Sequence, residues 1–233
     1  MLVFGTRPEA IKMAPLVYAI KAKPDQFELK VCVTSQHREM LDQVLDIFNI
    51  KPDIDLNLMK KNQNLSNLTS IILNNMQTVF TKHQPNIVLV HGDTTTTLAT
   101  SMAAFYESIS VGHVEAGLRS FNMRMPEEVN RILTDRISDV LFCPTQTAVN
   151  NLAKEGFKNF DANVFITGDV MQDAAMYYKA KSDGISTILN DLALEKGTFT
   201  LGTIHRAENT DDIVRLNEIV VALNEVNAQN RLV

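Results

Sequence analysis

Polar residues with the chemistry of an active site gather at five places along the chain, each directly after a short apolar run. The five clusters begin at Gly5, Gln36, Gly92, Glu115 and His205. Together they supply carboxyl groups, imidazoles and cationic side chains, which serve proton transfer and anion binding. Ligands of open parallel sheets bind just beyond the carboxyl ends of the strands. If the apolar runs are such strands, the clusters stand where an active site needs them.

The first cluster combines a glycine turn, Arg7 and the expected start of a helix at Pro8. Proline suits the first helical turn because its missing N–H would have no partner there. Helix N-termini attract anions, and Lys12 lies one turn further on. Contact with a phosphate or nucleotide and an ordinary turn with a solvated Arg7 explain the pattern equally well. Neither a Walker loop nor a dinucleotide-binding glycine fingerprint is present.

Two carboxyl groups, Asp93 and Glu115, directly follow predicted strands. Asp93 stands where a helix N-cap is expected, and capping, worth about 1 kcal/mol, is the alternative to a carboxylate aimed into a cleft. Glu115 precedes Ala116 and Gly117, which is a poor place for a merely solvated charge. A buried carboxyl group there would have a raised pKa, suited to general acid or base catalysis.

Glu127 and Glu128 form a further acidic site, directly after Pro126. The simplest interpretation is that both are acids of a first helical turn. Asn130 and Arg131 follow at spacings that place them on the same helix face as Glu127.

Metal binding is the weaker interpretation of the histidines. His205 with Glu208, and His113 with Glu115, give only pairs, and the sequence holds no His-Glu-x-x-His or Cys/His ligand set. The stretch 53–55 imitates the Asp-x-Asp of metal-dependent glycosyltransferases, but it precedes an apolar segment instead of ending one. We therefore expect no metal site.

The elements that must position these residues form a regular series up to residue 168. Short apolar runs alternate with segments of helical period, which predicts a parallel sheet wrapped by helices, in the α/β class. Strands are expected at 2–4, 27–34, 54–58, 86–91, 109–114, 140–143 and 164–167, and helices at 8–22, 38–48, 65–80, 95–106 and 127–137, with another ending at residue 155. Right-handed crossovers would join them into one doubly wound sheet.

The regular alternation of short apolar runs and helical segments ends at Gly168. Helices are expected at 171–181, 186–192 and 211–227, a strand at 199–204, and the start of another at 231–233. One strand with an unfinished successor cannot make a stable open sheet. We therefore expect an N-terminal Rossmann-like domain over 1–168 that carries the acid–base residues. Residues 169–233 are expected to be a linker and the beginning of a second, truncated Rossmann-like nucleotide-binding domain.

The composition is that of an ordinary globular protein. Of 233 residues, 45% are hydrophobic and 21% charged, and the net charge is -5. This balance argues against a nucleic-acid or acidic-membrane binder. No apolar run approaches the ~20 residues of a membrane span, and no secretion signal opens the chain. Cys32 and Cys143 lie in apolar runs and are expected to be buried, reduced thiols, which fits a cytoplasmic protein.

Taken in order, the clusters resemble the non-hydrolysing UDP-N-acetylglucosamine 2-epimerases. The matching stretches are Phe4-Gly5-Thr6-Arg7-Pro8-Glu9-Ala10-Ile11-Lys12-Met13-Ala14-Pro15, Gln36-His37-Arg38-Glu39-Met40-Leu41, His91-Gly92-Asp93-Thr94-Thr95-Thr96, His113-Val114-Glu115-Ala116-Gly117-Leu118-Arg119, Pro126-Glu127-Glu128-Val129-Asn130-Arg131 and His205-Arg206-Ala207-Glu208-Asn209. Each stretch alone is weak, but six in the correct order over nearly the whole chain make a specific match.

The resemblance implies a two-domain glycosyltransferase-B-like fold with its active site between the domains, usually in a homodimer. It implies interconversion of UDP-GlcNAc and UDP-ManNAc, which supplies ManNAc units for cell-surface polysaccharide, without metal or nicotinamide cofactor. The family's site residues fall here on Asp93, Glu115, Glu127 and His205 as catalytic groups, and on Arg7, Lys12, Gln36 and Arg206 as substrate-binding groups.

The chemistry of that reaction explains the residue types. The C2 proton of a 2-acetamido sugar has no adjacent carbonyl group, so simple deprotonation would be slow. If UDP leaves C1 as C2 loses its proton, a 2-acetamidoglucal forms, and UDP then adds back while a proton reaches the other face of C2. One carboxyl group must accept a proton and another must donate one, while cations steady the diphosphate. Which acid serves which face stays open.

Departures from the family pattern widen the range of functions to consider. Glu39 and Asn62 stand where substrate-regulated members carry glutamine and arginine, so such regulation is in doubt. The stretches 122–126 and 168–171 lean toward relatives that act on modified UDP-2-acetamido sugars. A UDP-sugar-dependent glycosyltransferase of the same fold and a non-catalytic nucleotide-sugar binding module would also account for these residues. Family proteins also run well beyond residue 233, and a chain that ended there would be expected to epimerise poorly or not at all.

Overall fold

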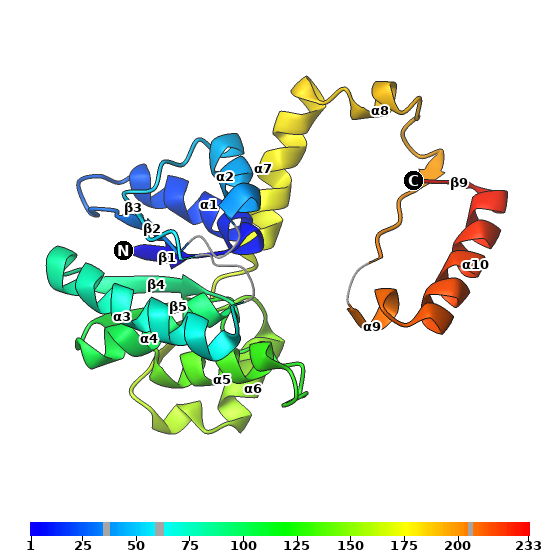
Figure 1. Ribbon diagram of the computed structural model, residues 1–233. Helices are drawn as coiled ribbons and strands as arrows, with labels where there is room; N and C mark the ends of the chain where they lie inside the picture. Colours follow the sequence, from blue (N-terminus) through cyan, green and yellow to red (C-terminus); the bar gives the residue numbers. More distant parts are fainter. Residues whose placement is uncertain (35–37, 59–62, 205–206) are drawn as a thin grey trace. The chain divides into compact units, whose positions relative to one another are not determined.

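The computed structural model describes residues 1–34, 38–58, 63–204 and 207–233. They form two compact units, residues 1–177 and 178–233, which divide within helix α7 (Val170–Ile185). The larger unit holds a parallel sheet with helices around it, and the smaller one holds a short parallel strand pair and a long helix (Figure 1).

In the described part of the larger unit, seven parallel strands form one sheet in the order β3-β2-β1-β4-β5-β6-β7. They are β1 (Leu2–Phe4), β2 (Val31–Val33), β3 (Ile54–Asp55), β4 (Ile87–His91), β5 (Ser110–Val114), β6 (Val140–Cys143) and β7 (Asn163–Ile166). The chain winds outward from β1 in one direction and from β4 in the other. The direction therefore reverses between β1 and β4, the switch point where doubly wound sheets bind ligands. The α/β doubly wound prediction is confirmed.

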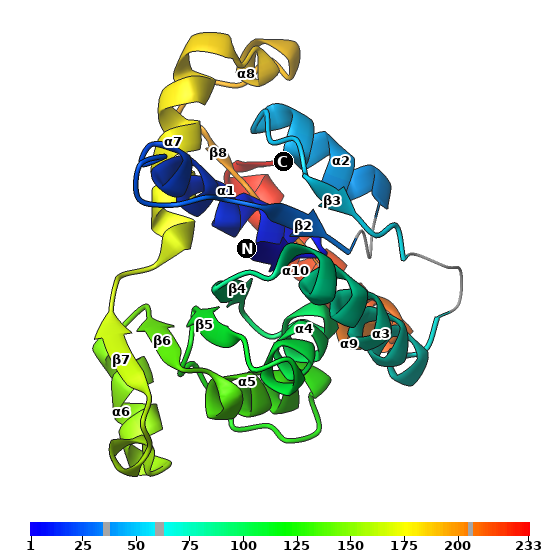
Figure 2. The ribbon, with the colours of Figure 1, turned by 90° about the vertical axis from the view of Figure 1, so that its left-hand side faces the viewer.

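The helices of this unit lie on both faces of the sheet. They are α1 (Arg7–Lys21), α2 (Arg38–Ile47), α3 (Leu65–His83), α4 (Thr95–Tyr106), α5 (Pro126–Ile137) and α6 (Gln146–Lys154), with a short 3-10 turn η1 (Phe157–Asn159). Helix α1 packs beside α2, while α4 lies between α3 and α5 (Figure 2). The same right-handed crossover, run in opposite directions from the switch point, puts these two groups on opposite faces.

The core lies between the central strands and the helices. Leu2, Val3 and Phe4 of β1 are fully buried. The predicted stripe of α3 supplies Leu68, Ile72, Met76, Val79 and Phe80 to a cluster with residues of β1, β2, β4 and α4. Leu65 was expected in this stripe but is 50% exposed, and it lines a pocket at the strand ends.

The two cysteines are free and buried, as expected. Burial is the main cause that raises the pKa of Cys32 to about 12, and the nearby charge of Asp55 adds to it. Burial likewise raises the pKa of Cys143 to about 12, with a contribution from Asp135. Both thiols are therefore protonated and unreactive near neutral pH.

Some strands are shorter than the sequence predicts. The run 27–34 yields only Val31–Val33, because β1 offers partners at Leu2, Val3 and Phe4 alone, and Phe27 is half exposed. Where no neighbouring ladder exists, apolar character by itself does not make a strand.

The smaller unit contains β8 (Phe199–Thr200) paired in parallel with β9 (Arg231–Leu232), and α10 (Ile213–Gln229) connects them. The short helices α8 (Ile188–Asp191) and α9 (Ala207–Thr210) precede α10, and α9 was not predicted. The predicted strand 199–204 keeps only its first two residues. In the described part of the chain, no helix is both long enough and apolar enough to cross a bilayer.

Candidate active site

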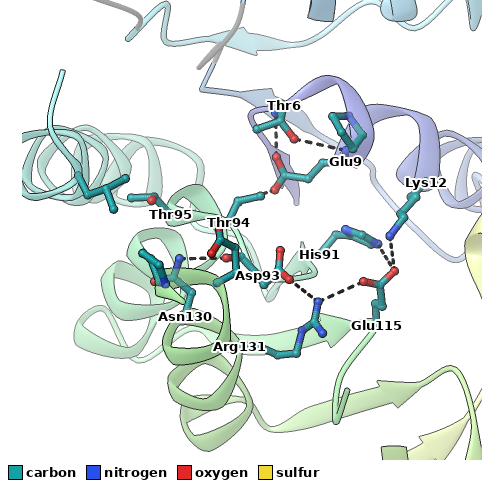
Figure 3. Close-up of a pocket in the computed structure, with 14 residues that line it drawn as sticks. Thr6, Glu9, Lys12, His91, Asp93, Thr94, Thr95, Glu115, Asn130 and Arg131 are labelled. Carbon is teal, nitrogen blue, oxygen red and sulfur yellow. Dashed lines mark hydrogen bonds and ion pairs between the residues drawn. The ribbon is translucent and has the colours of Figure 1, made fainter. Parts of the chain in front are cut away.

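A pocket of about 540 Å³ opens at the carboxyl ends of β1, β4 and β5, at the switch point of the sheet (Figure 3). Its walls come from the turns and first helical residues after these three strands, with one residue of α3. The lining residues are Thr6, Pro8, Glu9, Lys12, Leu65, His91, Asp93, Thr94, Thr95, Glu115, Pro126, Glu127, Asn130 and Arg131. The three carboxyl groups singled out in the sequence, at positions 93, 115 and 127, thus share one hollow.

The carboxylate of Glu9 stabilises the turn between β1 and α1. Thr6 is the N-cap of α1, and Glu9 completes a capping box with it. One carboxylate oxygen of Glu9 accepts the N–H groups of Gly5 and Thr6 at 3.0 and 2.7 Å, and the other accepts the Thr94 hydroxyl at 2.7 Å. Glu9 is 2% exposed, so this carboxylate ties the turn after β1 to the turn after β4.

The N–H groups of Gly5 and Thr6, which directly precede α1, donate to the Glu9 carboxylate. That the start of α1 contacts a phosphate or nucleotide stays a prediction. Arg7 is exposed and does not line the pocket, whereas Lys12, one turn further on, does. Of the two predicted substrate-binding cations in this cluster, the structure brings Lys12 to the carboxyl groups.

Asp93 is not the helix cap that its position suggested. Thr94 is the N-cap of α4, and its hydroxyl accepts the N–H of Thr97. The Asp93 carboxylate is therefore available to the pocket, where it accepts a hydrogen bond of 2.5 Å from a guanidinium nitrogen of Arg131. The side-chain amide of Asn130 donates to the Asp93 carbonyl at 2.9 Å, so α5 holds this residue at two points (Figure 3).

Glu115 is a buried carboxylate surrounded by nitrogen atoms. It is 9% exposed and follows β5 with a φ of 69°. Lys12 Nζ lies 2.5 Å from Oε2, His91 Nε2 lies 3.4 Å from the same oxygen, and the Arg131 nitrogen that binds Asp93 lies 3.4 Å from Oε1. One guanidinium nitrogen therefore bridges two of the three acids.

The pKa of Glu115 is the opposite of the sequence expectation. Burial does raise it, but the facing imidazole of His91 and the Lys12 ammonium group more than reverse that effect and lower the pKa to about 2. Glu115 is thus an ionised carboxylate at neutral pH. It can accept a proton there but has none to donate.

Glu127 and Glu128 are both first-turn acids of α5, as predicted, but their surroundings differ. Glu128 is 3% exposed and its carboxylate accepts the N–H groups of Ser120 and Phe121 at 2.9 and 2.8 Å. Burial raises its pKa, yet these bonds outweigh burial and the pKa is lowered. Glu127 is exposed to the pocket and makes no hydrogen bond or ion pair with another described residue.

His91 is a pocket residue to which the sequence analysis gave no role. It is 3% exposed, and neither of its ring nitrogens makes a hydrogen bond with a described residue, although Nε2 faces Glu115. Only its position in the sequence could have indicated it. His91 is the last residue of β4, just as Val114, which directly precedes Glu115, is the last residue of β5. The candidates Gln36, His205 and Arg206 lie outside the described residues. Among the described residues, no three His, Cys, Asp or Glu side chains are grouped as a metal site.

Comparison with known proteins gives a consistent result. A family model described as UDP-N-acetylglucosamine 2-epimerase matches residues 19–233. A UDP-N-acetylglucosamine 2-epimerase of Escherichia coli O157:H7 is 52% identical over 195 residues, which are 83% of this chain and 51% of that protein. The enzyme of the same name from Bacillus subtilis strain 168 is 52% identical over 212 residues, 90% of this chain and 54% of its own. The chain thus spans about half the length of the curated relatives it matches.

Solved structures show the same likeness in three dimensions. The S. aureus MnaA–UDP co-structure matches with a TM-score of 0.86 and 43% identity, over 100% of this chain and 60% of that one. The Methanocaldococcus jannaschii UDP-GlcNAc 2-epimerase in complex with UDP-GlcNAc and UDP matches with a TM-score of 0.82 and 34% identity, over 97% and 62% of the two chains.

Proposed function

The chain belongs to the UDP-N-acetylglucosamine 2-epimerase family, and from this premise we propose that it carries the acid–base half of such an epimerase. The reaction would invert C2 of UDP-GlcNAc to give UDP-ManNAc, and the reverse. One observation carries the proposal: Asp93, Glu115 and Glu127 line a single pocket at the switch point, with Lys12 and Arg131 among them. Acid and base groups around one hollow suit proton removal from a sugar carbon and proton return to its other face.

In the proposed reaction, a carboxylate takes the C2 proton while the C1–O bond breaks. The electron pair of the C1–O bond leaves with UDP. The resulting 2-acetamidoglucal then regains UDP at C1 while a proton reaches the opposite face of C2. Glu115, ionised by its neighbours, is in the form that can accept a proton, and the half-buried Asp93 and the exposed Glu127 are the remaining acid–base groups. Lys12 and Arg131 supply the positive charge that a leaving diphosphate needs.

The rest of the site is proposed from the family resemblance. His205, Gln36 and Arg206 would complete it together with Arg7, as catalytic and substrate-binding groups. The smaller unit would be the beginning of a second Rossmann-like nucleotide-binding domain after residue 168, since β8, α10 and β9 form a parallel strand–helix–strand unit. Because the chain covers about half of its relatives, the activity is proposed for the protein that contains residues 1–233.

Assembly and location belong to the same proposal. We expect a homodimer, as is usual in the family, and sedimentation velocity would measure the mass in solution. A cytoplasmic location is supported by the two buried free thiols, which suit a reducing compartment.

The test is hydrogen exchange at C2. Incubation with UDP-GlcNAc in D₂O without an acceptor should place deuterium at C2 and produce UDP-ManNAc. Asp93→Asn, Glu115→Gln and Glu127→Gln should each slow this by about 10²- to 10⁴-fold, the usual contribution of a positioned acid or base. Glu28→Gln, which changes an exposed carboxylate, serves as the control. Tight binding of UDP-GlcNAc without exchange would instead favour a binding module or a glycosyltransferase.

A further inference from the structure

Beneath the pocket lies a fully buried histidine that the proposed reaction does not use. His113 of β5 has no exposed surface. Its Nδ1 lies 2.7 Å from Oδ1 of Asp135 on α5, and its Nε2 lies 2.7 Å from the carbonyl oxygen of Gly92. Both ring nitrogens therefore face oxygen atoms, and the carbonyl oxygen can only accept a hydrogen bond.

Asp135 is held in its ionised form. Burial raises its pKa, but His113 and Arg119 outweigh burial and the pKa is lowered. Its Oδ2 lies 2.8 Å from Arg119 and 3.1 Å from the N–H of Gly117, and Arg119 in turn pairs with Glu155 at 2.7 Å. The Asp135 carboxylate is thus in contact with His113, Arg119 and the N–H of Gly117.

The position of this histidine connects it with each pocket acid. Gly92, whose carbonyl it binds, directly precedes Asp93. His113 itself lies two residues before Glu115 on β5. Asp135 lies on α5, the helix that carries Glu127 in its first turn and Arg131 further on, and α5 holds Asp93 through Asn130 as well.

We propose that His113 is a positioning residue: its hydrogen bond to the Gly92 carbonyl holds the turn that carries Asp93, its contact with Asp135 orients the ring, and the residue thereby sets the arrangement of the acids in the pocket. The inference rests on the proposed function, because it assigns the residue a part in that reaction. A displacement of about 1 Å in a catalytic group can cost 10²-fold in rate. A positioning residue therefore matters to the reaction even though it touches no substrate.

Two conservative variants separate the two hydrogen bonds of the His113 ring. The amide nitrogen of His113→Asn can take the place of Nδ1 and keep the bond to Asp135, while losing the bond to Gly92. The amide nitrogen of His113→Gln can take the place of Nε2 and keep the bond to Gly92. Each variant loses one buried hydrogen bond, and a purely structural role would harm H113Q at least as much as H113N, because H113Q loses the stronger bond to the buried Asp135 carboxylate.

The expected result is a split in kcat. H113N should lower the kcat of C2 deuterium exchange about 10²-fold with little change in KM, whereas H113Q should stay within about tenfold of the unsubstituted protein. The amide of Gly92, which donates to the Val114 carbonyl, should exchange its hydrogen faster in H113N than in H113Q. Equal kcat losses in both variants, or no loss in H113N, would overturn the proposal.

Two readouts need no substrate and so separate this inference from the proposed function. Nitrogen NMR of the unsubstituted protein should show that Nε2 of His113 carries the proton donated to the Gly92 carbonyl, and an unprotonated Nε2 would overturn the proposal. Should H113N fail to fold, the proposal stands if H113Q keeps its activity and falls if H113Q loses it. If the unsubstituted protein exchanges no C2 hydrogen, the proposed function fails. The NMR result and the Gly92 exchange rates of the two variants then still decide whether His113 holds the turn at Gly92.

Discussion

At the scale of single residues, the environment separates acids that the sequence presents as similar. Glu115 is buried against Lys12, His91 and Arg131, whereas Glu127 is exposed and free of such contacts among the described residues. The same substitution at these two positions removes a carboxylate with very different electrostatics. Their comparison therefore isolates the effect of the surrounding cations.

We predict that Glu115 couples stability to pH. Its folded pKa of about 2 lies below the ordinary value of 4.5, so ionisation stabilises the folded state above pH 4.5. That contribution is lost as the pH falls from 4.5 towards 2, and the shift corresponds to at most about 3 kcal/mol. Urea unfolding over this range should show a steeper loss of stability in the unsubstituted protein than in E115Q.

E127Q is the matched control for this prediction. It makes the same chemical change in the same pocket, but at an exposed carboxyl group, so the pH dependence of unfolding should match that of the unsubstituted protein. If E115Q and E127Q changed the pH dependence equally, the ion pair with Lys12 would not be the cause.

At the scale of the elements, turns after the strands place the acids, and their geometry leaves little room. Gly117 follows Glu115 in a left-handed conformation with φ of 76°, and a Cβ there would lie 2.7 Å from the carbonyl oxygen of Ala148 on α6. Its N–H also donates to Asp135. The turn after β5 is therefore pressed between α5 and α6, which fixes the direction in which Glu115 leaves the sheet.

We predict that Gly117→Ala is much more destabilising than Gly168→Ala. Both glycines have a left-handed φ, of 76° and 83°, so both variants suffer the ordinary strain of about 1 kcal/mol. A Cβ at Gly168 meets nothing within 4 Å, whereas at Gly117 it meets backbone. The added cost at Gly117 should be about 2 kcal/mol or more, as for an overpacked core site. Urea unfolding measures the loss in free energy of unfolding for both variants. Equal losses would mean that the turn after β5 moves to accommodate the added Cβ without a further cost in free energy.

At the scale of the whole molecule, the two units differ in how much apolar surface each buries. The larger unit has a seven-stranded sheet in its described part and a core with many fully buried side chains. In the smaller unit, Leu194 is the only residue of the described set that is buried. The exposed apolar residues of α10 include Ile213, Val214 and Val221. A two-stranded sheet with one helix and little core is marginal by itself.

We predict that a fragment of residues 1–177 folds by itself and that 178–233 does not. The first should give a cooperative thermal transition by circular dichroism and dispersed amide resonances. The second should show little helix and no cooperative transition, because it buries too little apolar surface to offset the entropy of ordering its chain. A cooperative transition in the fragment 178–233 would contradict this account.

The sequence by itself determined the order of the elements and the position of the acids along the chain. Apolar runs and the 3.6-residue helical period depend on local chemistry, so they predicted helix α4 and strand β6 at their observed bounds and put Asp93 and Glu115 at strand ends. Strand length was less predictable, as β2 shows, because a strand needs neighbours with which to pair.

Only the tertiary structure decided the electrostatics of the site. Lys12 lies 103 residues from Glu115 in the sequence, and their contact lowers a pKa that burial alone would raise. Likewise, the sequence offered Asp93 as a helix cap, but Thr94 takes that place and Arg131 of α5 binds the freed carboxylate. Charge interactions depend on distance in space, and the fold alone brings these distant residues within a few ångströms of each other.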